Sequence, residues 1–112
     1  MKRGEIYYAD LNPTIGSEIN KRRPVLIVSN DANNRAANMV TVLPLTSKTE
    51  RVFPFEVLLA AKSSGLSQNS KALAQQIRTL SKSRIVSNKI GELSPPLMLK
   101  IEAAIKLHLS LQ

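Results

Sequence analysis

Three consecutive cations, Lys21, Arg22 and Arg23, stand directly before a run of residues suited to a protein core. Pro24 follows them, and residues 25–28 are a continuous apolar, mostly β-branched run without a helical period. Such a run is typical of a strand buried on both faces, and a proline is tolerated where the ladder begins. The pattern predicts guanidinium groups held at the end of a rigid strand, where arginine can bind phosphate oxygens. The alternative is a solvated strand end.

The rest of the sequence lacks most of the residue sets that catalyse reactions. There is no Cys, and the one His, His108, is expected to be structural, which excludes a His-pair ribonuclease. The carboxylates lack metal-binding spacing and the four glycines form no phosphate loop, so no metal and no cofactor is expected. The side chains that remain for catalysis are arginine, serine or threonine, and one glutamate. This set suits attack of an RNA 2′-hydroxyl on its own 3′-phosphate, because the substrate supplies the nucleophile.

Composition and charge point to a polyanionic or acidic partner. The 112 residues are expected to form one domain, residues 1–112, with sixteen Lys and Arg against eight Asp and Glu and a net charge of +8. No acidic residue occurs between Val57 and Gly91. Four aromatic side chains are too few for a stacking platform on a sheet. The first residues lack the apolar core of a signal peptide and no apolar run is long enough for a membrane, so a cytoplasmic location is expected.

The elements that must position these residues are short strands and one long helix. Strands are predicted at residues 5–11, 25–28, 39–45 and 52–58, and residues 12–22, which contain Pro13 and Gly16, are predicted to form a long loop. Residues 31–38 form a loop or a single helical turn. Residues 60–70 form a turn region, residues 82–85 a short helix or turn, and residues 85–86 a short strand.

Two further segments complete the fold class. Residues 71–80 alternate as a strand does, although their Ala, Leu and Gln content favours a helix. Ser94 is a good N-cap, Pro95 suits the first helical position, and apolar residues recur on one helical face as far as Leu109. The sum is a mainly β chain with a C-terminal helix, which suits a small, partly open β-barrel.

The chain resembles the MazF/PemK (Kid) family of type II toxin–antitoxin endoribonucleases over essentially its whole length. The matching stretches, in chain order, are Arg3-Gly4-Glu5-Ile6-Tyr7, Asp10-Leu11-Asn12-Pro13, Gly16-Ser17-Glu18, residues 23–31, Leu43-Pro44-Leu45-Thr46, Phe53-Pro54-Phe55-Glu56-Val57 and Gln76-Ile77-Arg78-Thr79-Leu80. The resemblance implies an SH3-like barrel of the CcdB/MazF/PemK type. It also implies a homodimer, metal-independent cleavage of single-stranded mRNA at a short sequence, and inhibition by an acidic antitoxin. It favours a strand over residues 71–80, because the family carries Gln-Ile-Arg on the sheet.

The resemblance also implies site residues. The catalytic arginine of the family falls on Arg23, the catalytic threonine on Thr46, and the glutamate of the Gly-Ser-Glu loop on Glu18. The RNA-facing loop would be residues 13–22. The implied RNA-binding residues are Pro13, Ser17, Ile19, Asn20, Lys21, Arg22, Asn30, Ser47, Lys48, Gln76 and Arg78. Gln76 on a strand would equally well satisfy backbone groups. Ile19 and Asn20 stand where the family usually has Gln and Gly, so the cleavage sequence of a relative does not transfer.

The acidity of each side chain indicates its expected role in catalysis. A guanidinium group has a pKa above about 12 and gives up its proton poorly, so Arg23 is expected to stabilise the phosphorane. Glu18 is then the expected base if the loop brings it within reach, and Thr46 donates a further hydrogen bond. The products would be a 2′,3′-cyclic phosphate and a 5′-hydroxyl. If the pleat has begun at Arg22, its side chain points to the opposite face from Arg23 and meets a phosphate, an antitoxin or solvent.

Two other functions are compatible with the same fold class. One is a non-catalytic poison of DNA gyrase of the CcdB type, and the other is a basic RNA-binding barrel without turnover. Arg23-Pro24 together with Thr46 favours the enzyme, because a gyrase binder needs neither. Residues 109–112 supply no obvious contact for gyrase.

Overall fold

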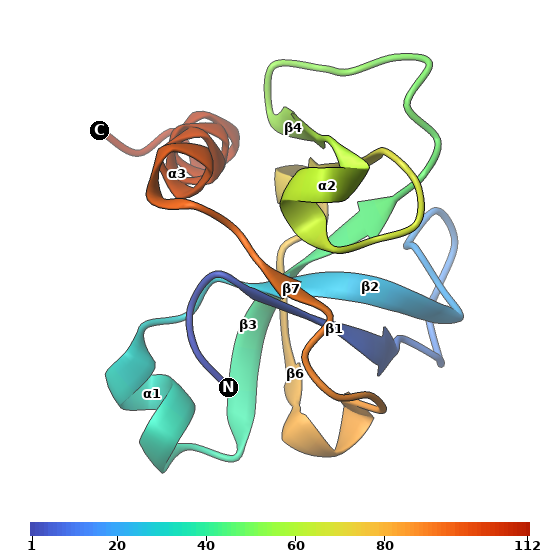
Figure 1. Ribbon diagram of the computed structural model, residues 1–112. Coiled ribbons are helices and arrows are strands. Elements are labelled where there is room, and N and C mark those ends of the chain that lie inside the picture. The colour runs from blue at the N-terminus through green and yellow to red at the C-terminus, as the bar shows by residue number, and fades with distance from the viewer.

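The computed structural model describes residues 1–112 and contains seven strands, three α-helices and two short 3₁₀ helices (Figure 1). In chain order these are β1 (Glu5–Asp10), β2 (Arg22–Ile27), α1 (Asp31–Ala36), β3 (Met39–Thr46), β4 (Glu56–Leu59), α2 (Ala61–Ser64), β5 (Ser70–Leu73), η1 (Ala74–Gln76), β6 (Arg78–Ser81), η2 (Lys82–Arg84), β7 (Gly91–Glu92) and α3 (Pro95–Leu109). No helix is long and apolar enough to cross a membrane.

The strands form one strongly bent antiparallel sheet in the order β4-β5-β3-β2-β1-β7, with β6 also paired to β3. The long strand β3 organises this arrangement. One of its edges pairs with β2, while its other edge pairs with β6 near its start and with β5 near its end. Figure 1 shows β6 and β4 at opposite ends of β3. The result is a half-barrel with a C-terminal helix, which confirms the predicted fold class.

The core lies on both faces of β2 and β3. On one face twelve buried residues, including Leu26, Leu43 and Ile101, pack under α3. On the other face seven buried residues, including Val25 and Ile27, pack against β6. Successive residues of β2 therefore enter different clusters, and the prediction of a strand buried on both faces is confirmed. A strand fixed in this way holds the residues at its start, Arg22 and Arg23, in place.

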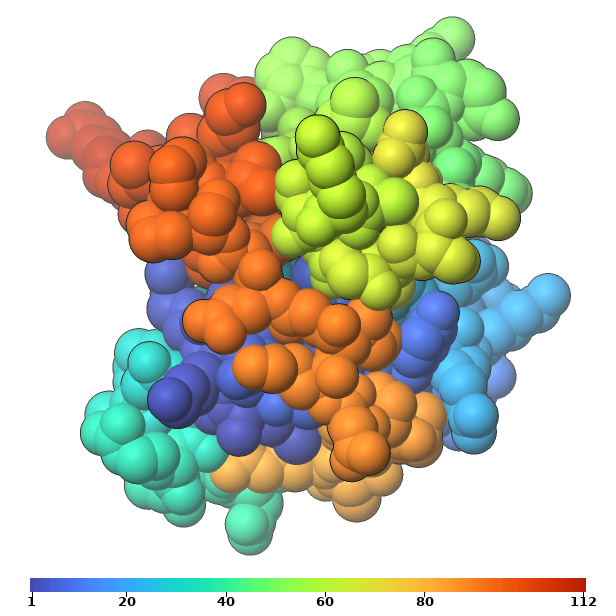
Figure 2. Space-filling view, viewed as in Figure 1, coloured from blue at the N-terminus to red at the C-terminus, as the bar shows by residue number.

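The C-terminal helix also begins where the sequence predicts. Pro95 occupies its first position, and the Ser94 side chain accepts a hydrogen bond from the Leu97 amide at 3.5 Å. Met98, Ile101 and Ala104 are its buried residues, and Figure 2 shows α3 at the surface beside the segment that contains β4 and α2. The His108 ring packs beside the Phe55 ring with a centroid distance of 5.9 Å, away from Arg23 and Thr46.

Three strand predictions are wrong in part. The fourth strand begins at Glu56 rather than at Val52, because residues 53–56 form a turn in which the Glu56 amide donates to the Phe53 carbonyl at 2.9 Å. Residues 71–80 form no single strand, and Gln76 lies in η1 rather than on the sheet. Along the same edge of β3 the register moves by three residues between β5 and β6, and η1 takes up this difference. At residues 85–86 only an isolated bridge between Ile85 and Ala9 is present.

Candidate functional site

A row of three polar side chains crosses adjacent strands at one end of the sheet. Val25 of β2 pairs with Pro44 of β3, and continuing that register by two residues sets Arg23 opposite Thr46. Thr46 in turn pairs with Lys71 of β5. All three residues line one open groove with a volume of about 310 Å³, called here the Arg23 groove. Strand pairing fixes Thr46 beside Lys71, and Arg23 is held on β2 by its pairing with Ala9 of β1.

Arg23 and Thr46 both present free hydrogen-bond donors to the groove. The Arg23 Nε atom donates to the Asn20 carbonyl at 3.0 Å, which orients the guanidinium group and leaves its two terminal nitrogens without a protein partner. Thr46 is buried, and its Oγ1 accepts a hydrogen bond from the Lys48 amide at 3.3 Å. Because that oxygen is the acceptor, the hydroxyl proton remains available for another group. The pair is able to donate to one oxyanion.

A buried ion pair forms the floor of the groove. Lys71 Nζ lies 2.8 Å from Glu56 Oε1, and the two side chains are only 11% and 3% exposed. Glu56 also accepts from the Gln75 amide at 2.6 Å and from the Phe53 backbone amide at 3.0 Å. Burial alone would raise the pKa of Glu56, but the hydrogen bonds from Lys71, Phe53 and Gln75 outweigh it and hold that pKa below its usual value. Glu56 is therefore an ionised partner for Lys71 and a weak base.

The loop at residues 12–21 forms one wall of the groove and is tied down by Gln76. The Gln76 side-chain oxygen accepts from the Ile19 amide at 3.0 Å, and its nitrogen donates to the Ser17 carbonyl at 3.3 Å. Further back, Arg78 donates to the Leu11 carbonyl at 3.4 Å. The amide group of Gln76 is thus occupied by the loop backbone on either side of Glu18.

The structure brings together about half of the residues that sequence reasoning singled out. Arg23, Thr46, Ser17, Ile19, Lys48 and Gln76 line the Arg23 groove. Arg22 and Ser47 line a second hollow on the other side of β2, which Arg23 also borders. Pro13, Glu18, Asn20 and Lys21 are exposed on the loop without lining either space. The Glu18 carboxylate accepts a hydrogen bond from the Ile15 amide at 2.6 Å, within its own loop.

Two of the predicted RNA-binding residues lie elsewhere. Asn30 is the N-cap of α1, with its side chain accepting from the Asn33 amide at 2.8 Å, and it borders a different hollow next to α3. The Arg78 guanidinium group holds the Leu11 carbonyl instead of facing the groove. Neither residue is brought to Arg23 and Thr46.

Glu56, Lys71 and Gln75 are site residues that sequence reasoning missed. Glu56 stands in the stretch Phe53-Pro54-Phe55-Glu56-Val57, whose match to the family was the available signal. Lys71 had no signal of its own, because it reaches Glu56 only through the pairing of β4 with β5. No group of three or more His, Asp or Glu side chains lies close enough together to hold a metal ion.

Comparisons with known proteins agree on one family. The family described as PemK-like, MazF-like toxin of type II toxin–antitoxin system matches residues 2–109. The endoribonuclease MazF9 of Mycobacterium tuberculosis is 43% identical over 99% of this chain and 98% of its own length. The endoribonuclease EndoA of Bacillus subtilis is 38% identical over 99% of this chain and 96% of its own length.

Solved structures give the same answer. A mycobacterial endoribonuclease in complex with its cognate antitoxin is 33% identical, has a TM-score of 0.82, and is matched over 100% of this chain and 97% of that chain. MazF from Deinococcus radiodurans, at 23% identity and a TM-score of 0.86, shares the fold over 99% of this chain and 97% of its own. The row Arg23, Thr46 and Lys71 thus lies in a chain that belongs to the PemK-like, MazF-like toxin family of type II toxin–antitoxin systems.

Proposed function

We propose that this protein is the toxin of a type II toxin–antitoxin pair and a sequence-specific endoribonuclease. It cuts single-stranded mRNA without a metal ion, by attack of a 2′-hydroxyl on the adjacent phosphate, and leaves a 2′,3′-cyclic phosphate and a 5′-hydroxyl. The observation that carries the proposal is that Arg23 of β2 and Thr46 of the neighbouring strand β3 line one open groove, each with a free donor. The endoribonuclease relatives at 38–43% identity support it.

In this mechanism Arg23 binds the non-bridging oxygens of the scissile phosphate, and Thr46 donates its hydroxyl proton to the same group. Negative charge grows on these oxygens as the phosphorane forms, so donors already in place lower the barrier. A single preorganised donor of this kind contributes a factor of about 10²–10³ to the rate. Lys71 carries a positive charge next to Thr46, but Glu56 neutralises it at 2.8 Å, so we assign the pair to holding the floor in place.

We assign the proton-accepting role to Glu18. Glu56 is a poor candidate, because its carboxylate is buried, paired with Lys71 and held at a lowered pKa. Glu18 is exposed, and its two neighbours, Ser17 and Ile19, both line the Arg23 groove. In this role the loop brings the Glu18 carboxylate to the 2′-hydroxyl of a bound RNA, and the carboxylate gives up the hydrogen bond that it accepts from the Ile15 amide.

The proposed partners are a second copy of this chain and an acidic antitoxin. A net charge of +8 favours an acidic partner. Apolar side chains that are exposed on α3 and just beyond it, Leu99, Leu107, Leu109 and Leu111, support an interface between copies. Because the proposed substrate is mRNA, the proposed place of action is the cytoplasm.

To test this proposal, the purified protein is incubated with a long single-stranded RNA in excess EDTA, and the ends of the products are mapped. Discrete cuts at one short sequence, lost in Arg23→Ala and Thr46→Ala, are expected. Arg35→Ala is the matched control, because Arg35 is an exposed arginine on α1 that lines neither the groove nor the second hollow. Intact RNA with the wild-type protein would overturn the proposal, and trapped DNA gyrase in a parallel assay would then identify a gyrase poison.

A further inference from the structure

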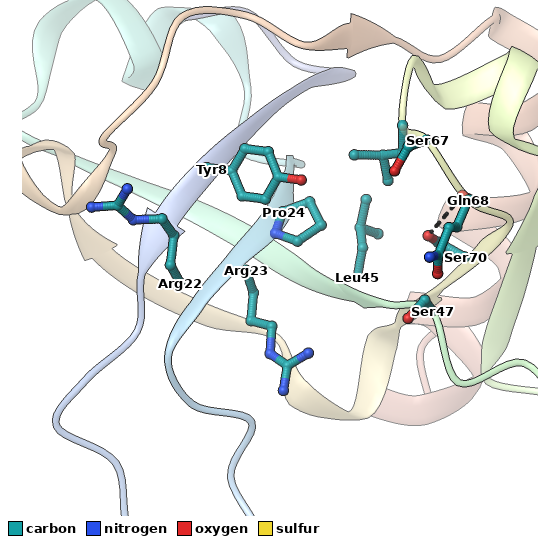
Figure 3. Close-up of a pocket in the computed structure, with 10 residues that line it drawn as sticks. Tyr8, Arg22, Arg23, Pro24, Leu45, Ser47, Ser67, Gln68 and Ser70 are labelled. Carbon is teal, nitrogen blue, oxygen red and sulfur yellow. Dashed lines mark hydrogen bonds between the residues drawn. The ribbon is translucent and has the colours of Figure 1, made fainter.

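The second hollow, on the other side of β2 from the Arg23 groove, is built from hydroxyl groups and cations. It has a volume of about 230 Å³, and only three of its ten lining residues are hydrophobic. In Figure 3, Tyr8 and Pro24 lie on one side, with the Tyr8 hydroxyl directed inward, and Ser67, Gln68 and Ser70 lie on the other. The space suits a sugar and a phosphate better than a large ligand.

Strand register explains why the two arginines serve different spaces. Tyr8 pairs with Pro24 and Asp10 with Arg22, so these residues share one face of the sheet, while Ala9 and Arg23 belong to the other. Figure 3 shows the guanidinium groups of Arg22 and Arg23 pointing away from each other. Arg23 nevertheless lines both spaces, so the hollow continues directly from the Arg23 groove. The prediction that Arg22 and Arg23 point to opposite faces is confirmed.

Most polar groups of the hollow are free to bind a ligand, and the exception is the Ser70 hydroxyl, which donates to the Gln68 carbonyl at 3.3 Å. The Arg22 side chain makes no hydrogen bond and no ion pair, and the hydroxyl groups of Tyr8, Ser47 and Ser67 have no protein partner. Asp10 is the cross-strand partner of Arg22, yet its carboxylate accepts from the Asn12 amide at 3.1 Å rather than pairing with the guanidinium group. In Figure 3 the Arg22 guanidinium group lies at the outer edge of the hollow, past Tyr8, and points away from the serines. A free guanidinium group at the edge of a space lined with hydroxyl groups can bind the phosphate of a nucleotide whose sugar enters that space.

We propose that this hollow is a second RNA subsite, in which Arg22 binds a phosphate of a nucleotide next to the scissile one while the Tyr8 and serine hydroxyls face its sugar. The inference rests on the proposed function, because it extends the same RNA strand past Arg23 and over β2. An acidic peptide is the weaker fit, since it would need apolar depressions for its side chains. Such a lining, with Val28, Ile105 and Leu111, occurs instead in the hollow next to α3.

The experiment measures binding of RNA that carries the mapped cleavage sequence with a 2′-deoxy residue at the cut position. Each phosphate of this RNA is replaced in turn by a neutral methylphosphonate. Wild-type protein is compared with Arg22→Ala and with the matched control Arg35→Ala. Arg22 is exposed and unpaired, so its substitution leaves the fold intact, and a thermal melt of each variant checks this.

Arg22→Ala is expected to bind the unmodified RNA about tenfold more weakly, with a slope of log affinity against log salt that is shallower by about 0.7. At one phosphate other than the scissile one, the methylphosphonate should weaken wild-type binding by the same factor and leave Arg22→Ala unchanged. Arg35→Ala should bind and cleave the RNA as the wild type does, because Arg35 lines neither space.

Equal sensitivity of both proteins at every phosphate would overturn the subsite, as would wild-type RNA affinity in Arg22→Ala. Loss of affinity only for an acidic antitoxin peptide would overturn it as well and assign the hollow to the peptide. Failure of the proposed function looks different: all-ribose RNA stays intact with wild-type protein, so no cleavage sequence is mapped. The same phosphate scan on one fixed single-stranded RNA then still reports whether Arg22 contacts RNA.

Discussion

The floor and the wall of the Arg23 groove are built in different ways. The floor consists of the row Arg23, Thr46 and Lys71, which lies on neighbouring strands, and of the buried ion pair between Lys71 and Glu56. The wall is the loop at residues 12–21, which Gln76 holds through two hydrogen bonds. Paired strands fix side chains more precisely than loops do, and loops accept sequence change more easily. In the proposed function, this difference places the stabilisation of the phosphorane on the floor, and the base Glu18 and the choice of RNA sequence on the wall.

The largest expected effect comes from breaking the floor at its ion pair. Lys71→Met leaves the Glu56 carboxylate buried without its partner, which typically costs about 3–5 kcal/mol of unfolding free energy. Urea unfolding followed by circular dichroism measures this cost. Lys48→Met, an exposed lysine on the rim of the same groove, is the matched control and should cost less than about 0.5 kcal/mol. Equal small losses for both variants would show that the pair does not support the floor.

Arg23→Ala removes a hydrogen-bond donor from the floor and should leave the fold intact. Because the guanidinium group is a donor to developing charge, the single-turnover cleavage rate should fall by about 10²–10³, while the melting temperature should stay close to that of the wild type. Arg22→Ala is the matched control within the same cationic run. A loss of rate in Arg22→Ala as large as in Arg23→Ala would contradict the separate roles assigned to the two arginines.

The acid stability of the floor gives a finer test. The pKa of Glu56 is lowered in the folded protein, so its ionised form stabilises the fold at pH values above its usual pKa, near about 4.3. That stabilisation should fade as the pH falls below about 4.3 towards the lowered folded value. The difference in unfolding free energy between wild type and Glu56→Gln should therefore be constant from pH 7 to pH 5 and shrink at lower pH. A difference in unfolding free energy that is the same at all these pH values would contradict a lowered pKa of Glu56 in the folded protein.

The smallest effect on kcat is expected at the wall. Gln76→Ala removes two hydrogen bonds to the loop, so it should cost about 1–3 kcal/mol of stability. Its main effect should be a raised KM and a relaxed cleavage sequence, with kcat little changed, because the loop is no longer held at Ser17 and Ile19. Sequencing of product ends reports this change. Gln112→Ala, an exposed glutamine that lines neither space, is the control that should keep the cleavage sequence.

The sequence predicted the parts of this molecule that depend on local pattern. The core strand after Pro24, the strand that ends at Thr46 and the helix that begins at Pro95 are all present, because apolar period and capping residues determine them locally. Residues 71–80 were predicted as one strand, because nothing in their pattern marks the three-residue change of register along β3.

In the candidate site, too, some residues follow from local sequence and others depend on strand pairing. Arg23 and Thr46 follow from motifs that each lie within one stretch of sequence. The pairing of Lys71 with Glu56 depends on which strands become neighbours, as does the use of the Gln76 amide by the loop backbone. The opposite orientation of Arg22 and Arg23 was predicted from the strand pleat, but the spaces that they line depend on the neighbouring strands and loops.

The most direct test of the central claim is single-turnover cleavage, in excess EDTA, of an RNA with one 2′-deoxy residue at the nucleotide 5′ to the mapped cut. We expect this RNA to stay intact. The same RNA with the deoxy residue one position away should be cut at the ordinary rate into a 2′,3′-cyclic phosphate and a 5′-hydroxyl. Cleavage at the deoxy position would contradict attack by the 2′-hydroxyl and, with it, the roles given to Arg23, Thr46 and Glu18.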